Sequence, residues 1–150
     1  MENIEGNKKK ILTQIEQAHK ISCFSSLPFP KLIAVSKKQE ECKIEIAIKC
    51  GQKFFGENRV QEAQQRWQKR LKIYKNLELR LIGPLQSNKV KHALNLFDII
   101  ETIDRDRLAN EIAKNFNNQS KTKSFYIQIN TGSETQKSGL NPLEADTFIE

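Results

Sequence analysis

The sequence has few of the residues that build metal sites and disulfide frameworks. Its 150 residues include three cysteines, none of them in a Cys-x-x-Cys pair, and two histidines that lie far apart along the chain. An odd number of unpaired cysteines is not a disulfide pattern, and the histidines have no zinc-ligand spacing. The sequence therefore indicates neither a disulfide framework nor a metal site.

Long apolar runs and glycine-rich phosphate loops are also missing. No segment approaches the roughly 18 consecutive apolar residues of a membrane span. Residues 1–7 are polar and acidic, where a signal peptide would be basic and then apolar. The chain contains no Gly-x-Gly-x-x-Gly and no Gly-x-x-x-x-Gly-Lys-Ser/Thr. We therefore expect a cytoplasmic protein without a membrane partner and without either of these nucleotide-binding signatures.

Basic residues outnumber acidic ones. With 25 Lys and Arg against 18 Asp and Glu, the formal net charge is +7. A basic balance suits an anionic partner, either a phosphorylated small molecule or a nucleic acid, and does not choose between them. The length suits one domain, so we expect residues 1–150 to form a single domain.

Apolar periodicity predicts strands that alternate with helices. Spacings of three and four residues predict helices over 8–21, 40–50, 58–75 and 87–96, with two more starting near 105 and 141. Short β-branched or alternating runs predict strands over 31–37, 53–56, 79–82, 97–103 and 124–130. Asp104 is the expected N-cap of the helix that follows it. Alternation of this kind is typical of a parallel α/β sheet.

Polar residues at the ends of the strands favour a barrel over a doubly wound sheet. A (β/α)8 barrel presents its chemistry from several strand ends on one rim, whereas a doubly wound sheet binds its ligand at one switch point. Here the polar strand-end residues are Lys37, Glu57, Asn58, Gln86, Ser87, Asn88, Lys89, Thr102 and Asn130. The predicted fold is a partial (β/α)8 TIM-type barrel, comprising the first five parallel strands and an extra N-terminal helix.

The first predicted strand ends in a lysine. In an extended strand Lys37 shares a face with Ile33 and Val35, and this apolar neighbourhood disfavours an ammonium. The pKa of a lysine must fall from about 10.4 toward about 7–8 before its amine is a good nucleophile at neutral pH. The alternative is that Lys37 and Lys38 simply open a solvated loop.

Five motifs in order resemble the YggS/PROSC family of pyridoxal phosphate homeostasis proteins. They are Ala34-Val35-Ser36-Lys37, Phe55-Gly56-Glu57-Asn58, Gly83-Pro84-Leu85-Gln86-Ser87-Asn88-Lys89, Ile103-Asp104-Arg105, and Asn130 with Lys137-Ser138-Gly139. The resemblance implies a barrel like the N-terminal domain of alanine racemase. It also implies that Lys37 holds pyridoxal 5′-phosphate (PLP) as a Schiff base, with Asn58 near the cofactor.

The sequence departs from the family in two places. The family usually has a histidine where this chain has Arg80, so a permanently charged guanidinium would stand near the cofactor and either repel the ammonium form of Lys37 or attract an anion. Family members also run on for about half as long again, and that part carries the segments that bind the cofactor phosphate. The resemblance therefore implies an incomplete barrel and weak PLP binding. We expect the isolated chain to self-associate or to pair with a separately encoded C-terminal half.

Three other functions remain open at this stage. A racemase-like PLP enzyme would need a second acid or base facing Lys37, and the sequence nominates none. A nucleic-acid-binding protein would use the basic helix face, which carries Arg66, Lys69, Arg70, Lys72 and Lys75. No row of stacking aromatics accompanies this charge, so we expect a solvated helix face and no nucleic-acid partner. A fragment without function is the third alternative. We therefore expect PLP binding without enzymatic turnover.

Overall fold

One parallel sheet organises the molecule. A computed structural model describes residues 3–150 and contains five strands that pair in the order of the sequence, β1-β2-β3-β4-β5. The strands are β1 (Ala34–Val35), β2 (Phe54–Glu57), β3 (Glu78–Leu81), β4 (Ile99–Ile103) and β5 (Ser124–Ile127). Every pairing is parallel.

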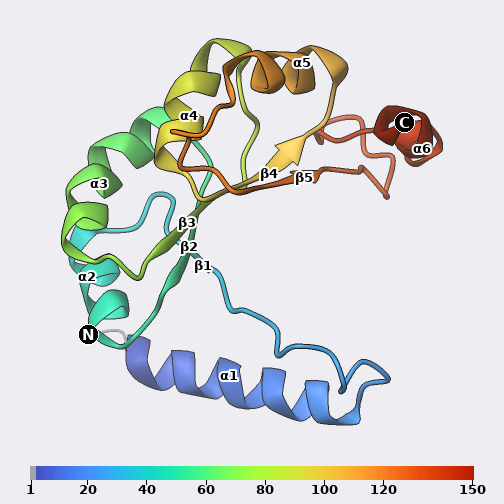
Figure 1. Cartoon of the computed structure of the whole chain (residues 1–150). Helices are drawn as coiled ribbons and strands as arrows, with labels where there is room; N and C mark the ends of the chain where they lie inside the picture. Colours follow the sequence, from blue (N-terminus) through green and yellow to red (C-terminus); the bar gives the residue numbers. More distant parts are fainter. Residues whose placement is uncertain (1–2) are drawn as a thin grey trace.

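Each strand is connected to the next by a helix. The helices are α1 (Ile4–Ile21), α2 (Glu41–Lys49), α3 (Val60–Ile73), α4 (Val90–Leu96), α5 (Asp106–Asn115) and α6 (Ala145–Ile149), with short 3-10 turns η1 (Ser87–Lys89) before α4 and η2 (Pro142–Glu144) before α6. In Figure 1 the sheet is curved, and α2 to α5 cover its convex face. A doubly wound sheet would have helices on both faces. The prediction of the first part of a (β/α)8 barrel is confirmed.

Alternating strand residues build the core on the convex face. Residues such as Phe55, Leu79 and Ile100 are at most 1% exposed and pack against apolar side chains of α2 to α5. The largest of these is Trp67 of α3, which is fully buried and lies 4.7 Å from Phe55 between ring centroids. At strand spacing, the intervening residues must face the opposite, concave side.

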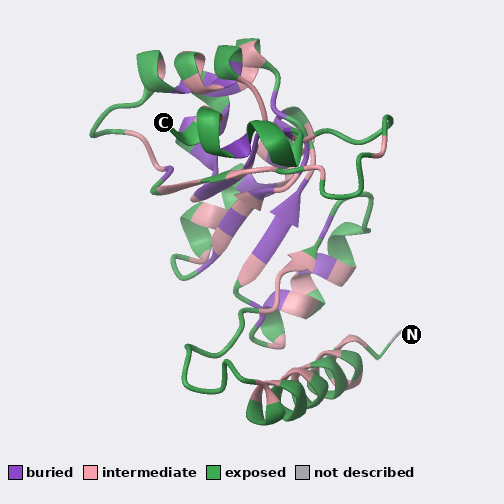
Figure 2. Ribbon diagram, turned by 90° about the vertical axis from the view of Figure 1, so that its right-hand side faces the viewer, coloured by how far each residue is buried: buried purple, intermediate pink, exposed green. Residues whose placement is uncertain are grey.

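The concave side of the sheet is much less covered. Figure 2 looks onto this side, and the strands are visible between α1 and the C-terminal helices. Val35 of β1 is 48% exposed and Tyr126 of β5 is 53% exposed. The extra helix α1 contains no buried residue and lies beyond the β1 edge, where Lys8 Nζ donates to the Cys50 carbonyl at 2.8 Å.

Two local predictions were wrong. The first strand is two residues long instead of the predicted 31–37, because the chain turns away at Ser36 once its N–H has bonded to the Gly56 carbonyl. Asp104 is not the helix cap, because its carboxylate accepts from the adjacent Arg105 guanidinium and α5 starts after Arg105 without a side-chain cap. Within residues 3–150, no helix combines the length and apolar character needed to cross a bilayer.

Candidate functional site at the carboxyl ends of the strands

Lys37 and Asn58 follow the carboxyl ends of two paired strands. Val35 pairs with Gly56, so β1 and β2 end at the same edge of the sheet, and Lys37 and Asn58 lie in the loops that follow them. The next strand end contributes Gly83. A Cβ at Gly83 would lie 2.3 Å from the Asn58 carbonyl oxygen, so only glycine allows this close approach. The loops after β1, β2 and β3 therefore form one rim.

Lys37 lies in a tight turn directly after β1. The Gln39 N–H donates to the Ser36 carbonyl across the turn at 3.2 Å, and Lys38 has a left-handed φ of 59°. The Lys37 side chain is exposed and has no hydrogen bond or ion pair to any residue from 3 to 150. The predicted apolar neighbourhood was wrong, because Val35 faces the open side of the sheet and is itself half exposed.

Asn58 lies between β2 and α3 and is partly buried. Its side-chain amide has no hydrogen-bond partner among the residues that the structure describes, so both its donor and its acceptor are available to a ligand. It borders a hollow of 650 Å³ between the loops that follow β2 and β3, together with Lys89 and Arg105. The rim therefore carries a free amine and a free amide on adjacent loops.

Arg80 lies in the middle of β3, below the rim. Its neighbours Leu79 and Leu81 are buried against the helices, which places Arg80 on the concave face. Its guanidinium donates to Glu78 at 2.7 Å and to Glu101 at 2.8 Å, and its side chain is 11% exposed.

Burial alone would lower the pKa of Arg80, but the hydrogen bonds to Glu101 and Glu78 outweigh burial and raise it. The guanidinium is therefore charged, and two of the protein's own carboxylates already neutralise it. A contact between Arg80 and a cofactor remains a prediction. Such a contact would require a guanidinium N–H group of Arg80 that does not already donate to Glu78 or Glu101.

Asn130, the polar residue after β5, organises its own loop. Its amide nitrogen donates to the Glu134 carbonyl at 2.8 Å, and its amide oxygen accepts from the Glu134 N–H at 3.2 Å. Asn130 lies at a strand end, as expected, but these hydrogen bonds occupy its side chain. Of Lys37, Asn58 and Asn130, only the first two have side-chain polar groups without a partner among the described residues.

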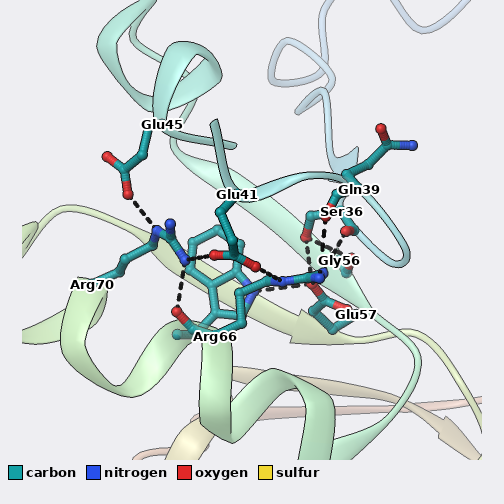
Figure 3. Close-up of polar contacts among 9 residues, drawn as sticks. Ser36, Gln39, Glu41, Glu45, Gly56, Glu57, Arg66 and Arg70 are labelled. Atoms are coloured by element: carbon teal, nitrogen blue, oxygen red, sulfur yellow. Dashed lines mark hydrogen bonds and ion pairs between the residues drawn. The ribbon is translucent and has the colours of Figure 1, made fainter. Parts of the chain in front are cut away.

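Glu57 was predicted among the polar residues on the rim, but its carboxylate is buried below the Lys37 turn. Glu57 is fully buried, and its Oε1 accepts hydrogen bonds from Ser36 Oγ at 2.8 Å, Trp67 Nε1 at 3.0 Å and Arg66 Nη1 at 3.1 Å (Figure 3). The signal was present in the alternation, since Glu57 shares a strand face with the buried Phe55. A carboxylate at a core position needs partners, and these partners come from β1 and α3.

The predicted basic face of α3 is only partly basic. Arg66 and Arg70 turn toward α2 and β2, where they pair with Glu41, Glu45 and Glu57, and their side chains are 16% and 13% exposed. Burial alone would lower the pKa of both arginines, but their hydrogen bonds to these glutamates raise it. Only the three lysines of the predicted face are exposed to solvent.

Comparison with known proteins gives related sequences along the whole chain. A pyridoxal phosphate homeostasis protein of Vibrio cholerae is 35% identical over 152 residues, which cover 100% of this chain and 64% of the relative. One of Buchnera aphidicola is 40% identical over 140 residues, which cover 93% of this chain and 60% of the relative. No protein-family model matches the chain.

A solved structure with the same fold carries the cofactor. PipY of Synechococcus elongatus with PLP bound superposes with a TM-score of 0.68 at 28% identity, covering 91% of this chain and 63% of PipY. The chain thus spans about three fifths of the length of the relatives that it matches.

Proposed function

We propose that this chain belongs to the pyridoxal phosphate homeostasis protein family and that it binds PLP at the rim formed by the loops after β1 and β2. The observation that carries the proposal is the exposed, unpaired amine of Lys37 after β1, together with the unpaired amide of Asn58 in the loop after the neighbouring strand β2. When bound, PLP would supply an electrophilic aldehyde carbon, and the amine of Lys37 would be the group that holds it.

The residues of the rim fit the reactive end of the cofactor. Lys37 would supply the amine, and the amide of Asn58 would offer a donor and an acceptor to polar ring substituents. The residues that the family resemblance assigns to the phosphate have no counterpart among these 150 residues. We therefore propose that these 150 residues by themselves bind PLP weakly.

We further propose that binding is not accompanied by turnover. A racemase needs a second acid or base opposite the lysine, and within residues 3–150 no titratable side chain forms a hydrogen bond or ion pair with Lys37. An assay for racemisation of alanine, with and without PLP, tests this point. Turnover that disappears in Lys37→Ala would favour the racemase-like enzyme instead. The cytoplasmic location remains a prediction from the sequence, as does pairing with a second polypeptide.

Titration with PLP followed by borohydride reduction tests the binding proposal. We expect a weak, saturable change in absorbance and, after reduction and peptide mapping, a pyridoxyl label concentrated on Lys37. The label should disappear from this peptide in Lys37→Ala. It should persist in Lys38→Ala, a matched control on the next residue of the same turn. Labelling spread evenly over the lysines of the chain would contradict the proposal, and tight stoichiometric binding would contradict the expected weakness.

A further inference from the structure

The turn that carries Lys37 is held from the convex side by one guanidinium. Arg66 of α3 donates through Nη1 to the Ser36 carbonyl at 2.7 Å and through Nη2 to the Gln39 carbonyl at 3.2 Å (Figure 3). These two carbonyls lie at the two ends of the turn, on either side of Lys37 and Lys38. The planar fork of an arginine can bind both at once, which the single ammonium of a lysine cannot do with the same geometry.

Glu57 fixes this guanidinium and the start of the turn together. Its Oε1 accepts from Arg66 Nη1 at 3.1 Å and from Ser36 Oγ at 2.8 Å, and the Ser36 N–H bonds to the Gly56 carbonyl. Its second oxygen, Oε2, is buried without a hydrogen-bond partner among the described residues. An unpaired buried carboxylate oxygen costs stability, and buried ion pairs are often less stabilising than apolar packing. The arrangement therefore contributes more to the precise placement of the turn than to stability.

The backbone of the turn needs such support. Lys38 adopts a left-handed φ of 59°, which is strained for a residue with a Cβ and persists where the surroundings hold it. The hydrogen bonds from Arg66 at both ends of the turn supply that constraint.

We propose that Arg66 and Glu57 are positioning residues that hold the Ser36–Gln39 turn, and through it the amine of Lys37, at the rim. This inference rests on the proposed function of Lys37. Neither residue contacts the cofactor site directly, because both act from the helix-covered side of the sheet.

Arg70 provides a matched control. It lies one helical turn after Arg66, is equally buried, and pairs with Glu41 and Glu45 at 2.5 Å. It also connects α3 to α2, but it makes no contact with the Lys37 turn within residues 3–150. If Arg66 were only a structural link between α2 and α3, then Arg66→Lys and Arg70→Lys would have the same consequences.

The experiment compares these two charge-conserving variants in the full chain. Hydrogen exchange of a peptide covering residues 34–41 reports on the turn without cofactor, and borohydride labelling reports on Lys37. We expect Arg66→Lys to speed exchange and to reduce the share of label on Lys37, each on the order of tenfold, since small displacements of a reacting group have effects of this size. Arg70→Lys should leave both unchanged.

Glu57→Gln is the second variant. It keeps an acceptor for Ser36 and Trp67 but removes the charge that holds Arg66, so its effect on exchange should lie between those of wild type and Arg66→Lys. Equal exchange in Arg66→Lys and Arg70→Lys would overturn the positioning role whether or not PLP binds. Absence of a label on Lys37 in the wild-type protein, with the exchange difference intact, would count against the proposed function and leave the role of Arg66 in the turn standing.

Discussion

The two faces of the sheet use charge differently. On the convex face, Arg66 and Arg70 of α3 join segments 25 to 30 residues apart and lie among fully buried side chains. On the concave face, Arg80 joins Glu78 on its own strand to Glu101 on the next strand. The convex network ties the helical layer to the rim, whereas the concave network ties only neighbouring strands.

The two faces also differ in how far water can reach their polar groups. Burial on the convex face excludes water, so polar groups there depend on specific partners, and these partners fix the geometry of the turns. Glu57 Oε2, which has no partner among the described residues, is an exception. The concave face is open, so water can replace a lost partner. Changes on the convex face should therefore affect stability most, and changes on the concave face should be tolerated better.

The largest expected effect tests this contrast with two aromatic residues. Trp67→Ala removes a fully buried ring that contacts Phe55 and donates to Glu57, and we expect a loss of about 3–5 kcal/mol in the free energy of unfolding. Tyr126→Ala, on the concave side, should change it by about 0.5 kcal/mol or less. Urea unfolding of both variants measures the difference. Similar losses would show that the concave face is covered in solution.

An intermediate effect is expected at Arg80. Arg80→Met leaves Glu78 and Glu101 without their shared partner, and because both are partly exposed the cost should be about 1–2 kcal/mol. Lys31→Met is the control, since Lys31 reaches Glu78 only at 3.7 Å from an exposed position and should contribute almost nothing. Denaturant unfolding measures both costs. Borohydride labelling of Lys37 in Arg80→Met also bears on the predicted cofactor contact, which a clear loss of label would support.

The smallest effect concerns Glu41, the exposed carboxylate that pairs with Arg66 and Arg70 on the convex face. Burial alone would raise the pKa of Glu41, but hydrogen bonds from Arg70 and Arg66 outweigh it and lower the pKa below its ordinary value. A lowered pKa stabilises the folded state above the unfolded carboxyl pKa of about 4.3, and the contribution disappears as pH falls through the lower folded value.

Because Glu41 is more than half exposed, its contribution should be about 0.5 kcal/mol or less. Glu41→Gln should therefore be slightly less stable than wild type at pH 7, and the difference should disappear as the pH falls below the pKa of Glu41 in the folded protein. Free energies of unfolding at several pH values check this. A difference that widened toward acid would have the wrong sign for a lowered pKa.

Local periodicity was sufficient to predict the fold. The alternation in β2 to β4 and the three- and four-residue spacings in α3 and α5 report directly on which side chains enter the core, so the element order and parallel sheet followed from the sequence. The short β1 did not follow, because an edge strand of two residues is set by one neighbour and by the turn after it. The Asp104 carboxylate pairs with the adjacent Arg105 guanidinium instead of capping α5, and the periodicity of apolar residues does not reveal such a local ion pair.

The candidate site was predictable only in part. Polar residues at strand ends of a parallel sheet converge on one rim, and the family resemblance then singled out Lys37 and Asn58 among them. The contact of Arg66 with the Lys37 turn could not be predicted in this way. Arg66 lies 30 residues from Ser36 in the sequence, and its spacing on α3 resembles that of a solvated basic face. Glu57 could have been suspected as a charged residue at a core position. Its three partners could be known only from the fold.

The sequential strand order also bears on how the chain acquires its structure. Each strand pairs with the strand made just before it, and paired residues are separated by about 20–25 positions throughout, so each loop closes at a similar, modest entropic cost. Each of the strands β2 to β5 can pair, as soon as it is synthesised, with the strand that precedes it in the sequence. The sheet can therefore grow in the order of synthesis, and the Arg66 contact to the Lys37 turn becomes available when α3 has formed, before β4 and β5 are made.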